Sequence, residues 1–95
     1  MVYKLILSEF YLRDVKETLA YYGLQEKELQ IGFDENLEKC YKLILEYPLL
    51  YSIRRKDIRR ANLSIFPYCV FYIVKKDKII LNRLVHQHRD PNIWP

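Results

Sequence analysis

The stretch that decides the fold is YCVFYIVKKDKIILNRLVH, residues 68–86. Its first part, Tyr68–Lys75, is almost continuously β-branched or aromatic, which is typical of a strand. Lys76-Asp77 is predicted to form a tight turn, followed by a last strand over Lys78–His86. The run Cys69–Val74 is apolar at every position, so it predicts a strand in the middle of a sheet, buried on both faces.

The N-terminal quarter predicts a strand followed by a helix. Val2–Leu7 is aliphatic and β-branched but too short for a helix, so we expect a first strand there. Ser8 suits a helix N-cap, and Glu9 places a negative charge in the first turn. Gly23 is predicted to end this helix with a positive φ. The apolar stripe of the helix, at three- to four-residue spacing, consists of Leu12, Val15, Leu19 and Tyr22.

A second, longer helix is predicted to end just before Pro48, because proline disfavours helix in the residue ahead of it. Beyond it, residues 51–58 are irregular and charged, and residues 60–66 read as a strand that Pro67 interrupts. The stripe of this second helix consists of Leu29, Phe33, Leu37, Cys40 or Tyr41, and Ile44.

These elements predict one α+β domain over residues 1–95, in the order β-α-α-β-β-β, with a helical hairpin packed on a small antiparallel sheet. The N-terminal strand is expected at an edge or beside the last strand. No apolar run approaches the roughly 20 residues of a membrane span. Cys40 and Cys69 lie within apolar patterns and no secretory signal is found, so we expect buried free thiols in a cytoplasmic protein.

Charge is divided unevenly along the chain. Residues 1–53 carry six basic and nine acidic side chains, whereas residues 54–95 carry ten basic and three acidic ones, so the net +4 combines −3 with +7. This split predicts a face for an anionic partner, either nucleic acid or an acidic protein. Lysines at strand ends can also serve only to keep edges soluble. Arginine suits phosphate and carboxylate partners better.

Few residue patterns point to an enzyme. Two glycines cannot form a glycine-rich phosphate loop, and no carboxylate pair is spaced across a cleft. His86 and His88 could bind a metal together, but only Asp90 is near enough to join them, and zinc prefers three or four ligands. No metal and no cofactor are therefore expected.

The C-terminal residues carry the most chemistry. Strict alternation along the last strand would place Asn82, Leu84 and His86 on one face, and Leu81, Arg83 and Val85 on the other. Arginine and histidine together can cleave RNA without a metal, although this composition also suits a solvated strand end. Trp94 either folds back to fix the tail or serves as an anchor for a protein partner.

Residues 59–74, with an arginine that opens a strand, a Phe-Pro-Tyr step and an apolar strand, resemble the signature of ParE-like toxins. Residues 79–91 and Trp94 are similar to the last strand of that family and its ending, in which Arg-Asp-Pro precedes a tryptophan. Tyr47-Pro48 and Tyr51 resemble the segment that follows the helices in the family. The chain is thus identified as a suspected member of the RelE/ParE toxin superfamily, in its ParE-like branch.

The resemblance implies the toxin of a type II toxin–antitoxin pair, of the kind linked to plasmid stabilization. The expected partner is a ParD-like antitoxin whose acidic C-terminal segment wraps and blocks the toxin. ParE-type toxins inhibit DNA gyrase without catalysis, and this is the function expected here. The alternative is a RelE-like, ribosome-dependent mRNA endoribonuclease.

RelE-like nucleases carry basic residues in the sheet and a C-terminal tyrosine, or a His-Tyr pair, for proton transfer. Here Gln87 follows His86 and no tyrosine follows Tyr72, which favours the gyrase-directed branch. The target-contact residues expected are Arg59, Arg60, Arg83, His86, His88, Arg89 and Trp94. If the chain is a metal-independent ribonuclease, its catalytic residues are expected to be Arg60, Arg83, His86 and Arg89.

Overall fold

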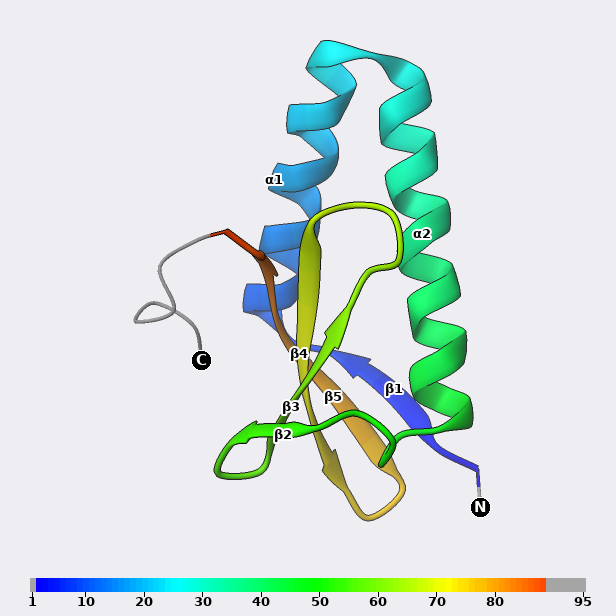
Figure 1. The fold of residues 1–95 in the computed structure, drawn as a ribbon, viewed down its shortest axis with the longest axis vertical. Coiled ribbons are helices and arrows are strands. Elements are labelled where there is room, and N and C mark those ends of the chain that lie inside the picture. The colour runs from blue at the N-terminus through cyan, green and yellow to red at the C-terminus, as the bar shows by residue number, and fades with distance from the viewer. Residues whose placement is uncertain (1, 89–95) are drawn as a thin grey trace.

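A computed structural model describes residues 2–88 of the chain, and residues 1 and 89–95 lie outside the described part. Two helices form an antiparallel hairpin that lies along one face of a sheet and projects beyond it (Figure 1). No helix in residues 2–88 is long and apolar enough to cross a membrane. The elements in chain order are β1 (Lys4–Leu7), α1 (Glu9–Gln25), α2 (Lys27–Glu46), β2 (Ile53–Arg55), β3 (Ile58–Asn62), β4 (Tyr68–Lys75) and β5 (Lys78–His86).

The sheet has the strand order β1-β5-β4-β3-β2. The predicted element order, the central position of β4 and the place of β1 beside β5 are confirmed. The sheet is mixed rather than antiparallel throughout, because β1 pairs in parallel with β5 after the long crossover through both helices. The additional strand β2 lies in the segment predicted to be irregular. All three of its residues are exposed, so no apolar alternation marks it.

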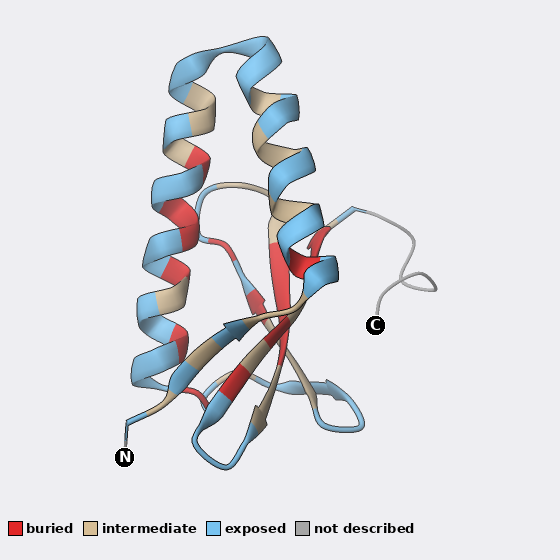
Figure 2. Ribbon diagram, turned by 180° about the vertical axis from the view of Figure 1, so that it is seen from behind, coloured by how far each residue is buried: buried red, intermediate tan, exposed pale blue. Residues whose placement is uncertain are grey.

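The main core lies between the helices and the sheet, as the buried positions in Figure 2 show. The predicted stripe of α2 is confirmed, since Phe33, Leu37, Cys40 and Ile44 are buried. In α1 the stripe was placed one residue too late at its start: Tyr11 is fully buried, whereas Leu12 is exposed. Both fit the helical spacing, but the Tyr11 hydroxyl can be buried because it hydrogen-bonds the Tyr41 hydroxyl.

The prediction that Gly23 ends the first helix is wrong. α1 continues through Gly23 to Gln25, neither glycine has a positive φ, and the hairpin turns at Glu26, whose backbone is extended. A Cβ on Gly23 would lie 2.6 Å from Nε2 of Gln30, which donates to the Leu19 carbonyl at 2.8 Å. A Cβ at this position would therefore displace the amide end of the Gln30 side chain from its bond to the Leu19 carbonyl.

The loop between β3 and β4 is longer than predicted, because β3 ends at Asn62 and not at residue 66. The buried side chain of Asn36 supports this loop. Its Oδ1 accepts hydrogen bonds from the backbone N–H groups of Ile65 (3.2 Å) and Phe66 (3.1 Å), and its Nδ2 donates to Ser64 Oγ (2.9 Å). A helix side chain thus replaces the ladder bonds that continuation of the strand would have supplied.

A bulge in the pairing of β4 and β5 changes which side chains share a face. Tyr72 pairs with Leu81 but Phe71 pairs with Arg83, so Asn82 is an extra residue. Leu81 and Leu84 consequently both belong to the helix-facing core, contrary to the strict alternation predicted. Val85 packs with Cys69 and Phe71 in a second cluster. The two cysteines are buried and free, as predicted.

Candidate functional site

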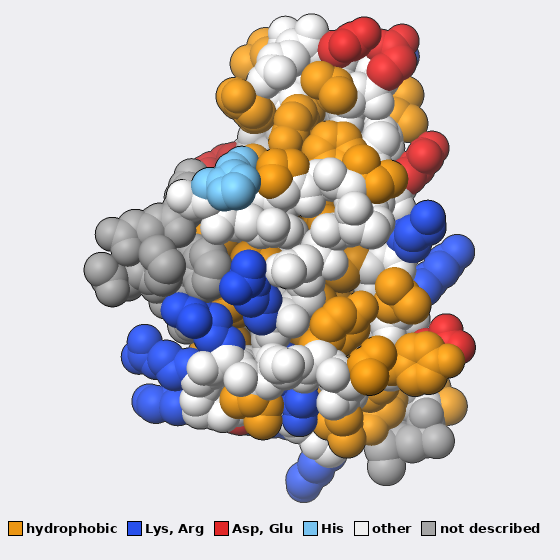
Figure 3. Space-filling view, in the orientation of Figure 1, with side chains coloured by type: hydrophobic (Ala, Val, Ile, Leu, Met, Phe, Trp, Pro, Cys, Tyr) orange, Lys and Arg blue, Asp and Glu red, His pale blue; other side chains and the backbone are white. Residues whose placement is uncertain are grey.

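A hollow of about 700 Å³ lies where α1 passes the C-terminal end of β5 and the start of β4. We call it the tyrosine–histidine hollow. The two histidines beside it are visible in pale blue in Figure 3. Its lining consists of Asp14, Glu17, Thr18, Tyr21, Tyr22, Gln25, Tyr68, Arg83, Leu84, His86 and His88. Three of the predicted target-contact residues, Arg83, His86 and His88, are therefore brought together.

His86 is held between Tyr68 and His88. Tyr68 and His86 are opposite one another on β4 and β5, and their ring centroids are 5.0 Å apart at 76°. The backbone N–H of His88 donates to Nδ1 of His86 at 3.1 Å. This bond makes Nδ1 an acceptor, so the neutral imidazole carries its proton on Nε2.

Tyr68 is a tyrosine beside His86 that the residue pattern did not predict. The family resemblance implies a tyrosine downstream of His86, whereas this one comes from the neighbouring strand β4. Counting outward from the turn at Lys76-Asp77 would have paired Tyr68 to within one residue of His86. Tyr68 also lies 6.3 Å from Tyr22 between ring centroids. Burial, with a smaller contribution from hydrogen bonding to Tyr68, raises the pKa of Tyr22 to about 12.

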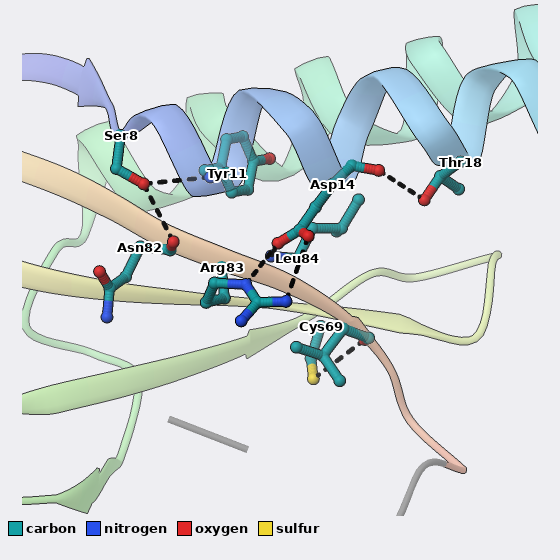
Figure 4. A network of polar contacts seen from close by, with 9 residues as sticks. Ser8, Tyr11, Asp14, Thr18, Cys69, Asn82, Arg83 and Leu84 are labelled. Carbon is teal, nitrogen blue, oxygen red and sulfur yellow. Dashed lines mark hydrogen bonds and ion pairs between the residues drawn. The ribbon is translucent and has the colours of Figure 1, made fainter. Parts of the chain in front are cut away.

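Arg83 is bound by Asp14 of α1 (Figure 4). Its Nε donates to Asp14 Oδ2 at 2.7 Å and its Nη2 donates to Oδ1 at 3.2 Å, a two-pronged contact. Oδ2 also accepts the backbone N–H of Leu84 at 3.0 Å. No local pattern marks Asp14 as the partner of Arg83, because 69 residues separate the two. These contacts raise the pKa of Arg83, mainly through the hydrogen bond to Asp14.

The start of α1 is fixed to the same stretch of β5. The Ser8 N–H donates to the Leu81 carbonyl, and Ser8 Oγ donates to the Asn82 carbonyl, each at 3.0 Å. Ser8 Oγ also accepts the N–H of Tyr11 at 3.1 Å, which confirms the predicted N-cap. The bonds to the Asn82 carbonyl and the Leu84 N–H lie on the edge of β5 beyond Leu81, the last residue that pairs with β1. We call this stretch, residues 82–84, the closed edge.

A second hollow of about 570 Å³ lies near the other side of the sheet, and we call it the arginine groove. Arg60 Nε donates to Asn62 Oδ1 at 3.0 Å beside this groove. Arg59 instead supports the preceding loop, since its Nη1 donates to the carbonyls of Tyr51 (2.7 Å) and Leu49 (3.2 Å). The lining of the groove consists of Leu50, Tyr51, Ser52, Arg54, Arg60 and Asn62.

The residues predicted for the ribonuclease alternative are thus divided. Arg83 and His86 line the tyrosine–histidine hollow, whereas Arg60 lines the arginine groove. Arg89 and Trp94 lie outside the described residues. Within residues 2–88, no group of three or more His, Cys, Asp or Glu side chains is placed to hold a metal.

The class of protein follows from comparison with known families. The family model described as the ParE toxin of the type II toxin–antitoxin system parDE matches residues 5–91. The chain therefore belongs to the ParE toxin family of type II toxin–antitoxin systems, and the suspected family membership is confirmed. No curated protein sequence matches the chain.

Two solved structures are similar in fold. A chain from a structure of the chromosomal ParDE TA system from P. aeruginosa has a TM-score of 0.78 and 13% identity, and the match covers 90% of this chain and 96% of that one. A copper-bound mutant toxin from Helicobacter pylori has a TM-score of 0.59 and 22% identity, and the match covers 90% and 94%. At these identities the likeness shows the fold.

Proposed function

We propose that this chain is a cytoplasmic ParE-type toxin that inhibits DNA gyrase by binding to it, and that a cognate ParD-like antitoxin neutralises it. Membership of the ParE family supports the choice of target. The observation that carries the proposal is the Asp14–Arg83 ion pair. In this pair the carboxylate of Asp14 binds the guanidinium of Arg83, which the ribonuclease alternative would use to bind phosphate.

Cleavage of RNA is assisted by cationic donors that are aimed in advance at the phosphate on which negative charge develops. Two donor groups of Arg83 are engaged by Asp14, and a second carboxylate, Glu17, lies in the same lining. Two carboxylates beside one arginine disfavour a phosphate backbone, which is recognised mainly through excess positive charge. Arg60, another cation expected at a nuclease site, lines the separate groove, and Arg89 lies outside the described residues. This arrangement supports binding of a protein rather than cleavage of RNA.

The composition of the hollow supports the same conclusion. Tyrosine and arginine are the side chains most enriched at the energetic centres of protein interfaces. Three tyrosines, Tyr21, Tyr22 and Tyr68, line the hollow beside Arg83. Tyr21 is 58% exposed, so its ring is available to a partner.

The proposal is tested by adding purified toxin to a gyrase supercoiling reaction, with Tyr21→Ala as the variant and Lys16→Ala, on the same helix, as the control. We expect the unaltered toxin and Lys16→Ala to inhibit supercoiling, and Tyr21→Ala to be at least about tenfold weaker, as for an interface anchor. Supercoiling that continues at saturating toxin would refute gyrase as the target.

One observation favours the RelE-like alternative. The rings of His86 and Tyr68 lie 5.0 Å apart between centroids, and an imidazole beside a phenol is the combination that proton transfer in such a nuclease would use. Translating ribosomes with a defined mRNA provide the test, and His86→Ala and Tyr68→Phe are the variants. Cleavage that both variants abolish would establish a ribonuclease and overturn the gyrase proposal.

A further inference from the structure

One wall of the tyrosine–histidine hollow is a continuous row of aromatic rings. The row runs from Tyr21 through Tyr22, Tyr68 and His86 to His88, and all five residues line the hollow. The centroids of successive rings are 5.4, 6.3, 5.0 and 5.3 Å apart, and each ring is turned by 50–76° from the next. Aromatic rings carry negative partial charge on their faces, so a wall of this kind attracts organic cations.

The charged side chains of the hollow have the same preference. Asp14 and Glu17 are acidic and Arg83 is basic, so the lining carries a net charge of −1 when the histidines are counted as neutral. The chain as a whole carries +4. The hollow is therefore an acidic, aromatic place on a basic protein, and a cationic group of a partner matches it better than an anionic one.

One guanidinium is already bound in this hollow, and its contacts indicate how another can be held. Arg83 of β5 binds the carboxylate of Asp14 through two hydrogen bonds, of 2.7 and 3.2 Å (Figure 4). Both oxygens of Asp14 are thus engaged, and Oδ2 also accepts the Leu84 N–H at 3.0 Å. A cation that enters from a partner needs a different acceptor.

Glu17 provides that acceptor. It follows Asp14 by three residues on α1, so the two side chains lie on the same face of the helix. Glu17 is exposed, and within residues 2–88 no hydrogen bond or ion pair engages its carboxylate. The pKa of Arg83 is raised mainly by the hydrogen bond to Asp14 and to a smaller extent by the charge of Glu17. The charge of Glu17 therefore reaches the hollow while its oxygens are available to a partner.

Tyr21 places an aromatic ring beside this carboxylate. It follows Glu17 by four residues, which is the spacing of neighbours on a helix surface, and its side chain is exposed. A guanidinium is planar, donates paired hydrogen bonds to a carboxylate and stacks on aromatic faces, whereas an ammonium group lacks the planar fork. The combination of Glu17 and Tyr21 thus favours arginine over lysine.

We propose that the tyrosine–histidine hollow binds one arginine side chain of the target protein. The guanidinium of that arginine hydrogen-bonds Glu17 and lies against the ring of Tyr21, beside the Asp14–Arg83 pair. The inference rests on the proposed function, from which gyrase is taken as the target. It adds the side chain that the hollow recognises and the residue, Glu17, that selects it.

The hollow itself is tested with N-acetyl-arginine amide, which is added to the intact, unaltered toxin while the ring signals of tyrosine and histidine are followed by NMR. N-acetyl-citrulline amide, which has a neutral urea group in place of the guanidinium and nearly the same shape, is the matched control. We expect the arginine compound to shift the Tyr21 and Tyr22 signals to saturation, with a Kd in the roughly millimolar range of so small a ligand. The citrulline compound should bind at least about tenfold more weakly.

Supercoiling reactions with gyrase test whether the target uses the hollow in this way. The variant is Glu17→Gln, and the control Glu35→Gln makes the same change at an exposed position of α2. We expect Glu17→Gln to raise the toxin concentration for half-inhibition at least about tenfold, because a hydrogen bond between charged groups is lost at the interface. Glu35→Gln should change it less than about twofold. Thermal unfolding verifies that both variants are folded.

Equal binding of the two compounds, or signal shifts confined to residues outside the hollow, would overturn the inference without the use of any variant. Inhibition of gyrase that is unchanged in Glu17→Gln would also overturn it, while gyrase would remain the target. Supercoiling that continues at saturating unaltered toxin would refute the target and with it the partner named here. Selective binding of the arginine compound would in that case still establish the hollow as a guanidinium site.

Discussion

The two edges of the sheet differ in how far their backbone groups are bonded within the fold. On the closed edge, beyond the end of β1, side chains of α1 take the backbone groups of β5: Ser8 binds the Asn82 carbonyl and Asp14 binds the Leu84 N–H. At the other end of the described sheet, β2 carries three exposed residues and pairs only with β3, and this strand is the open edge. An ion pair joins Asp14 and Arg83 on the first side, whereas residues 54–60 beside the second contain five cations and one acid. The first edge is thus held by contacts within the fold, and the second is the more exposed one.

The largest effect is expected from Asp14→Ala, which removes the side-chain bonds of α1 to the closed edge. Removal of the carboxylate leaves the Leu84 N–H and the Arg83 guanidinium without their acceptor. We expect a loss of about 2–3 kcal/mol in the free energy of unfolding, because hydrogen bonds to charged groups are the strong ones. Urea unfolding followed by circular dichroism measures it. Glu17→Ala, which removes a carboxylate from the same helix, should change stability by less than about 0.5 kcal/mol.

A smaller loss is expected from Arg59→Met, beneath the loop that leads to the open edge. Methionine keeps much of the aliphatic length but cannot donate to the carbonyls of Leu49 and Tyr51. We expect about 1–2 kcal/mol of destabilisation. Faster hydrogen exchange should be confined to β2 and the loop before it. If exchange rises equally in β5, the two edges are not independent.

A gain in stability is expected at the turns. Lys56 and Lys76 each have a positive φ (54° and 56°), a conformation that disfavours residues with a Cβ, and each is followed by aspartate in a tight hairpin turn. We expect Lys56→Gly and Lys76→Gly each to increase the free energy of unfolding by about 0.5–1 kcal/mol. The measurement is the midpoint of thermal unfolding, which should rise. The matched control Lys75→Gly lies in a strand and should instead destabilise the protein.

The smallest effect on stability is expected from Arg55→Glu, an exposed position of β2. If the cations of the open edge serve a partner and not the fold, reversing one of them should alter the free energy of unfolding by less than about 0.5 kcal/mol. Urea unfolding of the isolated toxin measures this. A loss as large as that of Asp14→Ala would contradict the division between the two edges.

Local patterns in the sequence were sufficient for the elements themselves. The bounds of β4 and β5 and the N-cap at Ser8 agree with the prediction, because strand composition and capping depend on neighbours along the chain. The prediction for Gly23 is wrong because the helix continues through it with an ordinary φ, and its nearest neighbour, Gln30, comes from the other helix. The same holds for the candidate site: Arg83 and His86 could be singled out, but their partners Asp14 and Tyr68 come from other elements. Contacts between residues that are far apart along the chain produce no periodic pattern in the sequence.

The parallel pairing of β1 with β5 has a consequence for the making of the protein. Lys4 is aligned with Lys78, so the first strand gains its neighbour only when the last one has been translated. At about 5–20 residues per second, synthesis of the intervening chain takes roughly 4–15 s. During that interval the nascent polypeptide cannot complete its sheet. A message truncated before the codons of β5 therefore yields a chain in which β1 has no strand to pair with.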